Sequence, residues 1–174
     1  VVEVDEAFIG GKDKPGPPGR GAAGKVLVVG AAEIRGKGVS RIRLAVIKDA
    51  SRASLTKFIM DNIDKGSNIR TDAWLGYGKL EGYQHLPLVE GSPERASVIL
   101  PHVHRIFSNL KTWLSGTHHG VSKQHLPAYL NEYVFRLNRR RTPMAAFQTV
   151  LGLIAERQGP TYKGLYGVAK GETV

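Results

Sequence analysis

The sequence predicts an α/β protein in which helices pack on a mixed sheet. Three segments rich in β-branched residues, 1–9, 25–34 and 39–49, occupy the first part of the chain. A helical segment and a short fourth strand follow, and amphipathic helices make up much of the last third. Strands that follow one another without a helix pair antiparallel, so this order predicts a mixed sheet with an antiparallel edge.

Two different connections separate the first three strands. Residues 12–24 are rich in basic, proline and glycine residues, which bury too little apolar surface to become ordered, and they predict a flexible basic loop. The second connection, 35–38, contains two glycines of the kind that a tight hairpin turn requires. We therefore expect a three-stranded antiparallel meander whose first strand ends near Ile9.

One helix and one strand come next along the chain. Ser51 is a residue type that caps helix N-termini, and Gly66 can end the helix that Ser51 begins. The apolar positions between them fall on one helical face: Leu55, Phe58, Ile59 and Ile63. A strand is expected at 68–72, and the Gly-, Tyr- and Pro-rich segment 74–101 predicts loops around one short strand at 86–89.

Three amphipathic helices are predicted after residue 101. The first covers 102–115 and is broken by Gly116, and the second covers 126–137 and continues into a run of arginines. The third begins at Thr142-Pro143, an N-cap followed by proline at the first helical position. Their apolar stripes are Val103, Ile106 or Phe107, Leu110 and Leu114; Leu126, Leu130, Tyr133, Val134 and Leu137; and Met144, Phe147, Leu151 and Ile154.

The resulting order of elements is that of the ribonuclease H-like fold. Three strands, a helix, a strand, a short strand and then helices give an α/β mixed sheet with helices packed on it. The sequence shows no internal repeat and no second domain. We expect one domain at 1–157 and a glycine-containing C-terminal tail at 158–174.

The chain is strongly basic. It has 25 Lys and Arg residues against 15 Asp and Glu residues, a net charge of +10, and such an excess favours a phosphate backbone as the partner. The absence of cysteine excludes disulfides and thiolate metal sites. No apolar run approaches the roughly 20 residues that cross a bilayer, so we expect a soluble, unexported protein with no membrane partner.

Two aspartates stand where two strands can bring them together. Asp5 lies in the first predicted strand and Asp72 ends the fourth, and in this order of elements the two strands are neighbours. Two-metal phosphoryl transfer needs several carboxylates that converge on ions about 3.5 to 4 Å apart, because hard Mg²⁺ prefers oxygen ligands. The pair therefore predicts a metal-dependent phosphoryl-transfer site.

Five blocks of sequence carry a resemblance to a known family. They are VEVDE at 2–6 with FIGGK at 8–12, TDAWLGY at 71–77, HRIFSNLKTWL at 104–114, GTHHGVS at 116–122 and YLNEYVFRLNRR at 129–140. In this order the blocks resemble bacterial insertion-sequence transposases of the DDE type, which have a ribonuclease H-like catalytic domain. The resemblance covers roughly residues 1–155.

The resemblance implies an enzyme that cleaves DNA strands and transfers them. Asp5 and Asp72 would be its first and second metal-binding carboxylates, with Mg²⁺ or Mn²⁺ as the cofactor. The implied partners are double-stranded DNA, as transposon ends and target, and a second copy of the chain in a homodimer assembled on DNA. The implied setting is the bacterial cytoplasm, in association with the nucleoid. Relatives carry an N-terminal DNA-binding or zinc-ribbon region before the catalytic domain, so we expect this chain to be a fragment or the product of a truncated gene.

The third catalytic position departs from the family pattern. Such enzymes often place Glu there, followed seven residues later by Lys or Arg, and counting back from Lys111 gives His104. On a helix of 3.6 residues per turn, His104, Ser108 and Lys111 share one polar face. Asn109 is an alternative third ligand, because its amide oxygen can bind a hard cation. Glu132 also has an arginine seven residues later, but it lies in a segment that predicts a packing helix.

Basic residues in three places are expected to contact DNA. Lys12 and Lys14 lie in the basic loop, and Lys111 lies on the helix that carries the third catalytic position. The remaining cations cluster at the end of the second predicted helix, where cations are favourable: Arg136, Arg139, Arg140 and Arg141.

Three alternatives to a transposase stay open on the sequence alone. A nuclease of the same fold shares the carboxylates but does not join 3′ ends to a target. A non-catalytic DNA-binding protein derived from a transposase binds DNA without cleaving it, and the missing third acid favours this alternative. An unrelated basic interaction module would leave Asp5 and Asp72 far apart.

Overall fold

The computed structural model describes residues 1–10, 25–72, 75–78, 80–88, 99–156 and 159. The chain divides into two compact units, Val1–Asn138 and Arg139–Val174. The first unit is shorter than the single domain expected at 1–157, and the boundary at residue 157 stays a prediction. Lys12 and Lys14, which we expect to contact DNA, lie outside the described residues.

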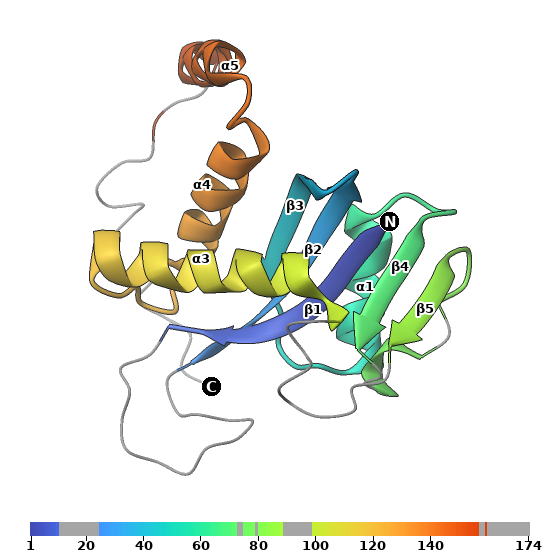
Figure 1. Cartoon of the computed structure of the whole chain (residues 1–174). Coiled ribbons are helices and arrows are strands. Elements are labelled where there is room, and N and C mark those ends of the chain that lie inside the picture. The colour runs from blue at the N-terminus through green and yellow to red at the C-terminus, as the bar shows by residue number, and fades with distance from the viewer. Residues whose placement is uncertain (11–24, 73–74, 79, 89–98, 157–158, 160–174) are drawn as a thin grey trace. The chain divides into compact units, whose positions relative to one another are not determined.

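A five-stranded mixed sheet forms the centre of the first unit (Figure 1). Its order is β3-β2-β1-β4-β5, with antiparallel pairing from β1 to β3 and parallel pairing from β1 through β4 to β5. The strands are β1 Val2–Ile9, β2 Val26–Arg35, β3 Gly38–Val46, β4 Asn68–Asp72 and β5 Gln84–Leu88. The predicted meander, its hairpin turn and the predicted mixed sheet are confirmed.

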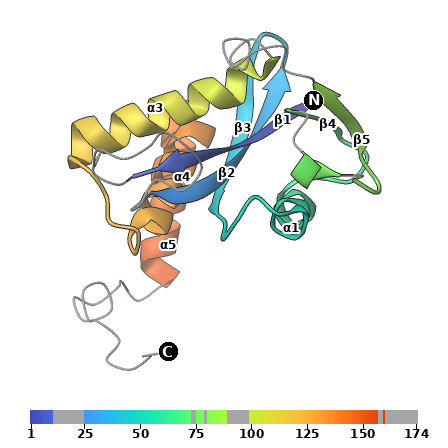
Figure 2. The same cartoon turned by 90° about the horizontal axis from the view of Figure 1, so that it is seen from below.

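Helix α1 (Arg52–Asn62) covers one face of the sheet, and helix α3 (Pro101–His118) lies on the opposite face (Figure 2). Ser51 caps α1 as predicted, since its side chain accepts a hydrogen bond from the Ser54 N–H. The helix ends at Asn62, before the expected stop at Gly66. Its apolar side chains pack with buried residues of the sheet and of the 3₁₀ turn η1 (Leu75–Tyr77): Val4, Val29, Ala31, Leu55, Phe58, Ile59, Ile63, Ile69, Tyr77 and Leu80.

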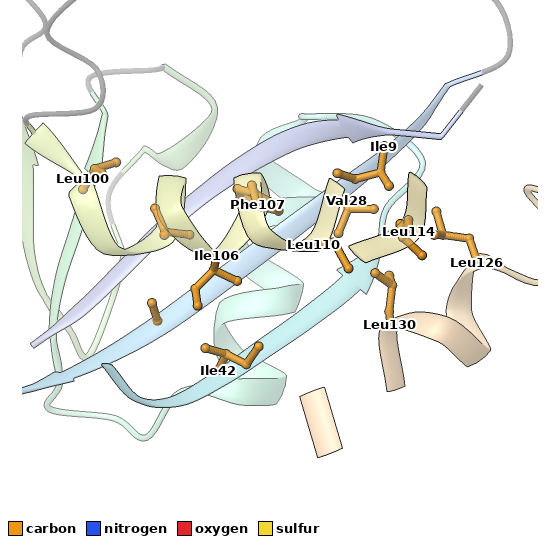
Figure 3. Close-up of a cluster of buried hydrophobic side chains, with 12 residues drawn as sticks. Ile9, Val28, Ile42, Leu100, Ile106, Phe107, Leu110, Leu114, Leu126 and Leu130 are labelled. Atoms are coloured by element: carbon orange, nitrogen blue, oxygen red, sulfur yellow. The ribbon is translucent and has the colours of Figure 1, made fainter. Parts of the chain in front are cut away.

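Helices α3 (Pro101–His118) and α4 (Leu126–Asn138) build a second apolar cluster with β1, β2 and β3 (Figure 3). Its buried members are Ile9, Val28, Ala32, Ile42, Leu100, Val103, Ile106, Phe107, Leu110, Leu114, Leu126 and Leu130. The Asn138 side chain fixes the end of α4 to β3, because it accepts a hydrogen bond from the Ile42 N–H at 2.8 Å and donates one to the Ile42 carbonyl at 3.1 Å. The apolar faces predicted for both helices are therefore confirmed.

The expected break of α3 at Gly116 is wrong. The helix continues to His118 and ends at His119, which adopts the left-handed conformation with φ 52°. A glycine inside a helix costs about 1 kcal/mol, which tertiary contacts can offset. Here the His118 ring packs edge-on against Trp113 and Tyr129, at centroid distances of 4.7 and 4.6 Å. These contacts stabilise the last turn of α3.

The second unit contains helix α5 (Pro143–Glu156), which begins where the Thr142-Pro143 pair predicts. The Ala146 N–H bonds to the Thr142 carbonyl in its first turn. None of its described side chains is buried, and the four apolar residues predicted as its packing face, Met144, Phe147, Leu151 and Ile154, are 50 to 67% exposed. Among the described residues, no helix is long and apolar enough to cross a membrane.

Candidate active site

The register of β1 and β4 points Asp5 and Asp72 to the same face of the sheet. These strands pair in parallel, with Val2 opposite Ile69 and Glu3 opposite Arg70. Continuing this register by two residues places Asp5 opposite Asp72, at the end of β4. Residues paired in this way point to the same face of a sheet. Both carboxylates therefore lie on one face, at the boundary between two neighbouring strands.

That face is the one covered by α3. Ala7 and Ile9 of β1 pack in the cluster that α3 forms with the sheet. Because side chains alternate along a strand, Glu3 and Asp5 share this face with them. Gly30 of β2 lies opposite Asp5, and a Cβ atom at that position would stand 2.8 Å from the ring of Phe107. The missing side chain at residue 30 thus lets α3 approach the sheet closely beside Asp5.

Tyr77 is a buried tyrosine whose hydroxyl is affected by several carboxylates. Burial raises the pKa of the Tyr77 hydroxyl well above its usual value of 10, and the negative charges of Glu6, Asp5 and Asp72 raise it further. Tyr77 donates a hydrogen bond to Glu6 Oε2 at 2.7 Å. Three carboxylates therefore act on one buried hydroxyl at the carboxyl end of β4.

His104 faces Asp5 from the first turns of α3. Its Nε2 atom lies 3.5 Å from Asp5 Oδ2, and the exposed fractions of the two side chains are 33% and 13%. His104, Ser108 and Lys111 line the same pocket of about 430 Å³ as Asp5, which is the polar face that helical spacing predicts. Asn109 is exposed and does not line this pocket.

Glu3 is a buried carboxylate whose part in the site the sequence did not reveal. Only 1% of it is exposed, and Oε2 accepts hydrogen bonds from the N–H groups of His102 and Val103 at 2.8 and 3.0 Å. Its Oε1 atom lies 2.9 Å from Nδ1 of His102. The N-cap residue of α3, Leu100, has no side chain that could serve these groups. A strand residue two positions before Asp5 therefore caps the helix that carries His104.

Residues 1–138 match the profile of the ISXO2-like transposase domain. The chain belongs to this family. Comparison with curated protein sequences found no match. The chain is therefore a transposase domain, and its five-stranded sheet with helices on both faces is the ribonuclease H-like fold that the order of elements predicts.

Solved structures with the same fold include retroviral integrases. The crystal structure of the catalytic core domain of BIV integrase superposes with a TM-score of 0.54 at 15% identity, over 79% of this chain and 82% of that chain. The cryo-EM structure of a simian T-cell lymphotropic virus intasome in complex with the PP2A regulatory subunit B56 gamma superposes with a TM-score of 0.51 at 14% identity. That match covers 79% of this chain and 47% of the other.

The donor atoms at the site of the transposase domain fit a hard divalent cation in part. Two carboxylates, Asp5 and Asp72, supply the oxygen atoms that Mg²⁺ and Mn²⁺ prefer, and His104 adds an imidazole nitrogen beside Asp5. No group of three or more His, Cys, Asp or Glu residues close enough to hold a metal occurs within the described part of the chain. Asp5 and His104 are therefore a close pair, and Asp72 lies on the same face of the sheet without completing a group of three close enough to share one ion.

The arginines predicted to bind DNA lie outside this pocket. Arg136, near the end of α4, pairs with Glu132 at 3.2 Å, and both side chains are about half exposed or more. Glu132 therefore bonds along its own helix and does not line the pocket that contains Asp5. Arg139, Arg140 and Arg141 begin the second unit. Of the predicted DNA contacts that the structure describes, only Lys111 shares a pocket with Asp5.

Proposed function

We propose that this transposase domain cleaves and joins DNA strands with two divalent ions, Mg²⁺ or Mn²⁺, held between Asp5 and Asp72. The observation that carries the proposal is the β1–β4 register, which puts both carboxylates on one face of adjacent strands. Bound ions would supply Lewis-acid stabilisation of the attacking and leaving oxygens in an in-line displacement. Net charge +10 supports DNA as the substrate, in the form of transposon ends and target.

The side chains around the aspartates have separate tasks in this proposal. Asp5 and Asp72 would hold the ions, which would supply Lewis-acid stabilisation at the scissile phosphate. His104, at 3.5 Å from Asp5, either completes the ligand set or carries a proton to or from the reacting oxygen. Lys111 contacts the DNA backbone rather than a metal, because an ammonium group cannot be a ligand.

For the third position, the geometry favours His104 over Asn109. His104 shares the pocket with Asp5, whereas Asn109 is exposed and lies outside it. Glu132 is engaged with Arg136 on α4. An imidazole nitrogen is a poorer partner for Mg²⁺ than for Mn²⁺, so a site completed by histidine should prefer Mn²⁺.

The partners that we propose are double-stranded DNA and a second copy of the chain. Joining two transposon ends to a target calls for one active site at each end, which supports a homodimer assembled on DNA. Lys12, Lys14 and the arginines at 136 and 139–141 are proposed DNA contacts, since cations of this kind neutralise phosphates without reading sequence. The proposed setting is the bacterial cytoplasm, at the nucleoid.

Removing either aspartate tests the proposed function. Asp5→Asn and Asp72→Asn should each lower the rate of strand cleavage and joining at least about a thousandfold, because bound ions stabilise the transition state by several kcal/mol. The matched control is Asp61→Asn on α1, an exposed aspartate that pairs with Lys57. The assay follows cleavage of a labelled transposon-end duplex and its joining to a target plasmid in Mg²⁺ and in Mn²⁺.

The possible results separate the proposal from its rivals. Cleavage without joining would identify a nuclease, and DNA binding without cleavage would identify a non-catalytic relative of transposases. Full activity in Asp5→Asn or Asp72→Asn would refute the metal site itself.

The third ligand is tested by exchanging it for the residue that other members carry. His104→Glu should strengthen Mg²⁺ binding and raise the rate of cleavage in Mg²⁺, because a carboxylate is a harder ligand than imidazole. Metal affinity, measured by calorimetry, and strand cleavage are compared for the parent, His104→Glu and Asn109→Ala. If His104→Glu changes nothing and Asn109→Ala abolishes metal binding, Asn109 is the third ligand.

A further inference from the structure

Two neighbouring pockets of the transposase domain form one continuous groove. The first contains Asp5 and His104, and the second extends towards the C-terminal end of α3. They share three lining residues, Phe8, Lys25 and Lys111. One wall of the groove follows β1 from Asp5 to Gly10, and the other follows α3 from His104 to Ser115.

The two halves of this groove differ in charge. The half with the aspartate contains Asp5 and Glu6. The other half, of about 920 Å³, is lined by no acidic residue among those described, and its cationic lining residues are Lys25 and Lys111. The hydroxyls of Thr112 and Ser115 also line this half, but they donate within α3 to the carbonyls of Ser108 and Thr112. Lys25 precedes β2 and Lys111 belongs to α3, so the two ammonium groups enter the groove from different elements.

At the end of the basic half, the backbone N–H groups that follow α3 are already hydrogen-bonded to carbonyls of the helix. The Gly120 N–H bonds to the Leu114 carbonyl at 3.2 Å, and the His119 N–H bonds to the Ser115 carbonyl at 3.2 Å. The carbonyls of Leu114 and Ser115 are therefore less available to repel an anion than those of an uncapped helix.

We propose that the basic half of the groove is a phosphate track that holds one DNA strand beside the scissile phosphate. In it, Lys25 and Lys111 contact neighbouring phosphates of that strand. From Lys111 to Ser115, the part of α3 that lines the basic half, the helix rises about 6 Å at 1.5 Å per residue. Phosphates of one strand follow about every 3.4 Å of helix axis, so this wall spans about two nucleotides. This inference rests on the proposed function, because it starts from the aspartate pair as the place of cleavage.

The charge of the track is tested by metal-free DNA binding. Lys25→Ala and Lys111→Ala should each weaken binding of a labelled 30-base-pair duplex in EDTA and each reduce the slope of log K against log salt by about one, the value for one lost phosphate contact. Lys57→Ala removes the same charge from the exposed face of α1 and should leave the slope nearly unchanged. Equal effects of all three substitutions would show a response to net charge alone and would overturn the track.

The position of the track is tested by a chemical tether. The chain contains no cysteine, so Ser115→Cys introduces a unique thiol on the wall of the basic half. It should form a disulfide with DNA that carries a tethered thiol, at one or two nucleotides a fixed distance from the cleavage position. Met60→Cys, at an exposed position of α1, is the control and should crosslink weakly and without preference.

The outcomes distinguish this inference from the proposed function. Crosslinking at Ser115→Cys without preference for any nucleotide, or no stronger than at Met60→Cys, contradicts the track even if the parent cleaves DNA. A localised crosslink together with a parent that never cleaves supports the track as a binding site and refutes the proposed function.

Discussion

The two faces of the sheet make opposite use of the same strand, β1. On the α1 face, Val2 and Val4 pack in an apolar cluster with Leu55 and Ile69, and Val4 is fully buried. On the α3 face, Glu3 caps a helix and Asp5 borders a pocket. Because strand side chains alternate, one face can fix the strand while the other presents charged groups. The apolar face should therefore determine stability, and the charged face should determine activity and the placement of α3.

The largest effect on stability is expected on the apolar face. Leu55→Ala removes a fully buried side chain from the contact of α1 with the sheet and should lower the free energy of unfolding by about 3 kcal/mol. The protein that remains folded should keep the parent's rate of strand cleavage, because Leu55 does not line the pocket around Asp5. Urea unfolding and cleavage per folded molecule measure the two quantities. A large loss of cleavage rate at unchanged stability would break the division between the faces.

Glu3 tests whether a charged group can also hold the fold together. Glu3→Ala leaves two N–H groups of α3 without their acceptor and should cost about 2 kcal/mol, whereas Glu3→Gln keeps one carbonyl oxygen and should cost less, about 1 kcal/mol. Glu33→Ala on β2 removes an exposed pair with Arg35 and should change stability by less than about 0.5 kcal/mol.

The cleavage rates of Glu3→Ala and Glu3→Gln test whether Glu3 also positions α3. If Glu3 positions α3 beside Asp5, folded Glu3→Ala should cleave more slowly than the parent, and Glu3→Gln should recover part of the rate. Equal cleavage rates per folded molecule in the parent, Glu3→Ala and Glu3→Gln would show that Glu3 contributes to stability but not to the position of α3 beside Asp5.

Gly30 sets the distance between the charged face and α3. Gly30→Ala puts a methyl group 2.8 Å from the Phe107 ring, so the helix must shift, at a cost of about 1 to 2 kcal/mol. Since His104 lies one turn before Phe107, the shift should also widen the 3.5 Å separation from Asp5 and lower the cleavage rate. Gly38→Ala has nothing within 4 Å of its new methyl group and is the control. Urea unfolding and the cleavage assay should give parent values for Gly38→Ala, and parent values for Gly30→Ala would contradict the close approach.

The sequence predicted the strands because these depend on local patterns, whereas the aspartate pair stays a prediction. The hairpin glycines, the β-branched runs and the strand at 68–72 specify the order in which β1 and β4 become neighbours. The buried face of α3 also followed from its spacing, as did the shared pocket of His104 and Lys111.

Features that depend on contacts between residues far apart in the chain could not be predicted from the sequence. Glu3 meets its partner His102 across 99 positions of the chain, and no local pattern distinguishes it from an exposed strand glutamate. Gly116 is unfavourable inside a helix, yet α3 continues beyond it because the ring of His118 contacts Trp113 and Tyr129. The apolar stripe of α5 identified a face of the helix but not what that face packs against, and none of its side chains is buried.

The smallest effect is expected at Tyr77, where the two faces meet. Its ring belongs to the apolar cluster of α1, and its hydroxyl bonds to Glu6 and experiences the charges of Asp5 and Asp72. Tyr77→Phe should cost only about 1 kcal/mol at neutral pH, the net worth of one hydrogen bond.

The difference in the free energy of unfolding between the parent and Tyr77→Phe should depend on pH, because nearby carboxylates affect the pKa of Tyr77. Burial, and then Glu6, Asp5 and Asp72, raise the folded-state pKa of Tyr77 above its unfolded value near 10. The stability linked to its proton is therefore complete below about pH 10 and is lost as the pH rises from there through the folded-state pKa. Tyr77→Phe has no such proton, so the greater free energy of unfolding of the parent should shrink towards that of Tyr77→Phe in urea unfolding experiments above about pH 10.

Asp72→Asn removes one of the charges that raise the pKa of Tyr77, and ultraviolet difference titration against a Tyr77→Phe background should show Tyr77 ionising at lower pH. An unchanged titration in Asp72→Asn would place Asp72 too far from Tyr77 to act on it and would weaken the case for an aspartate pair at this edge of the sheet.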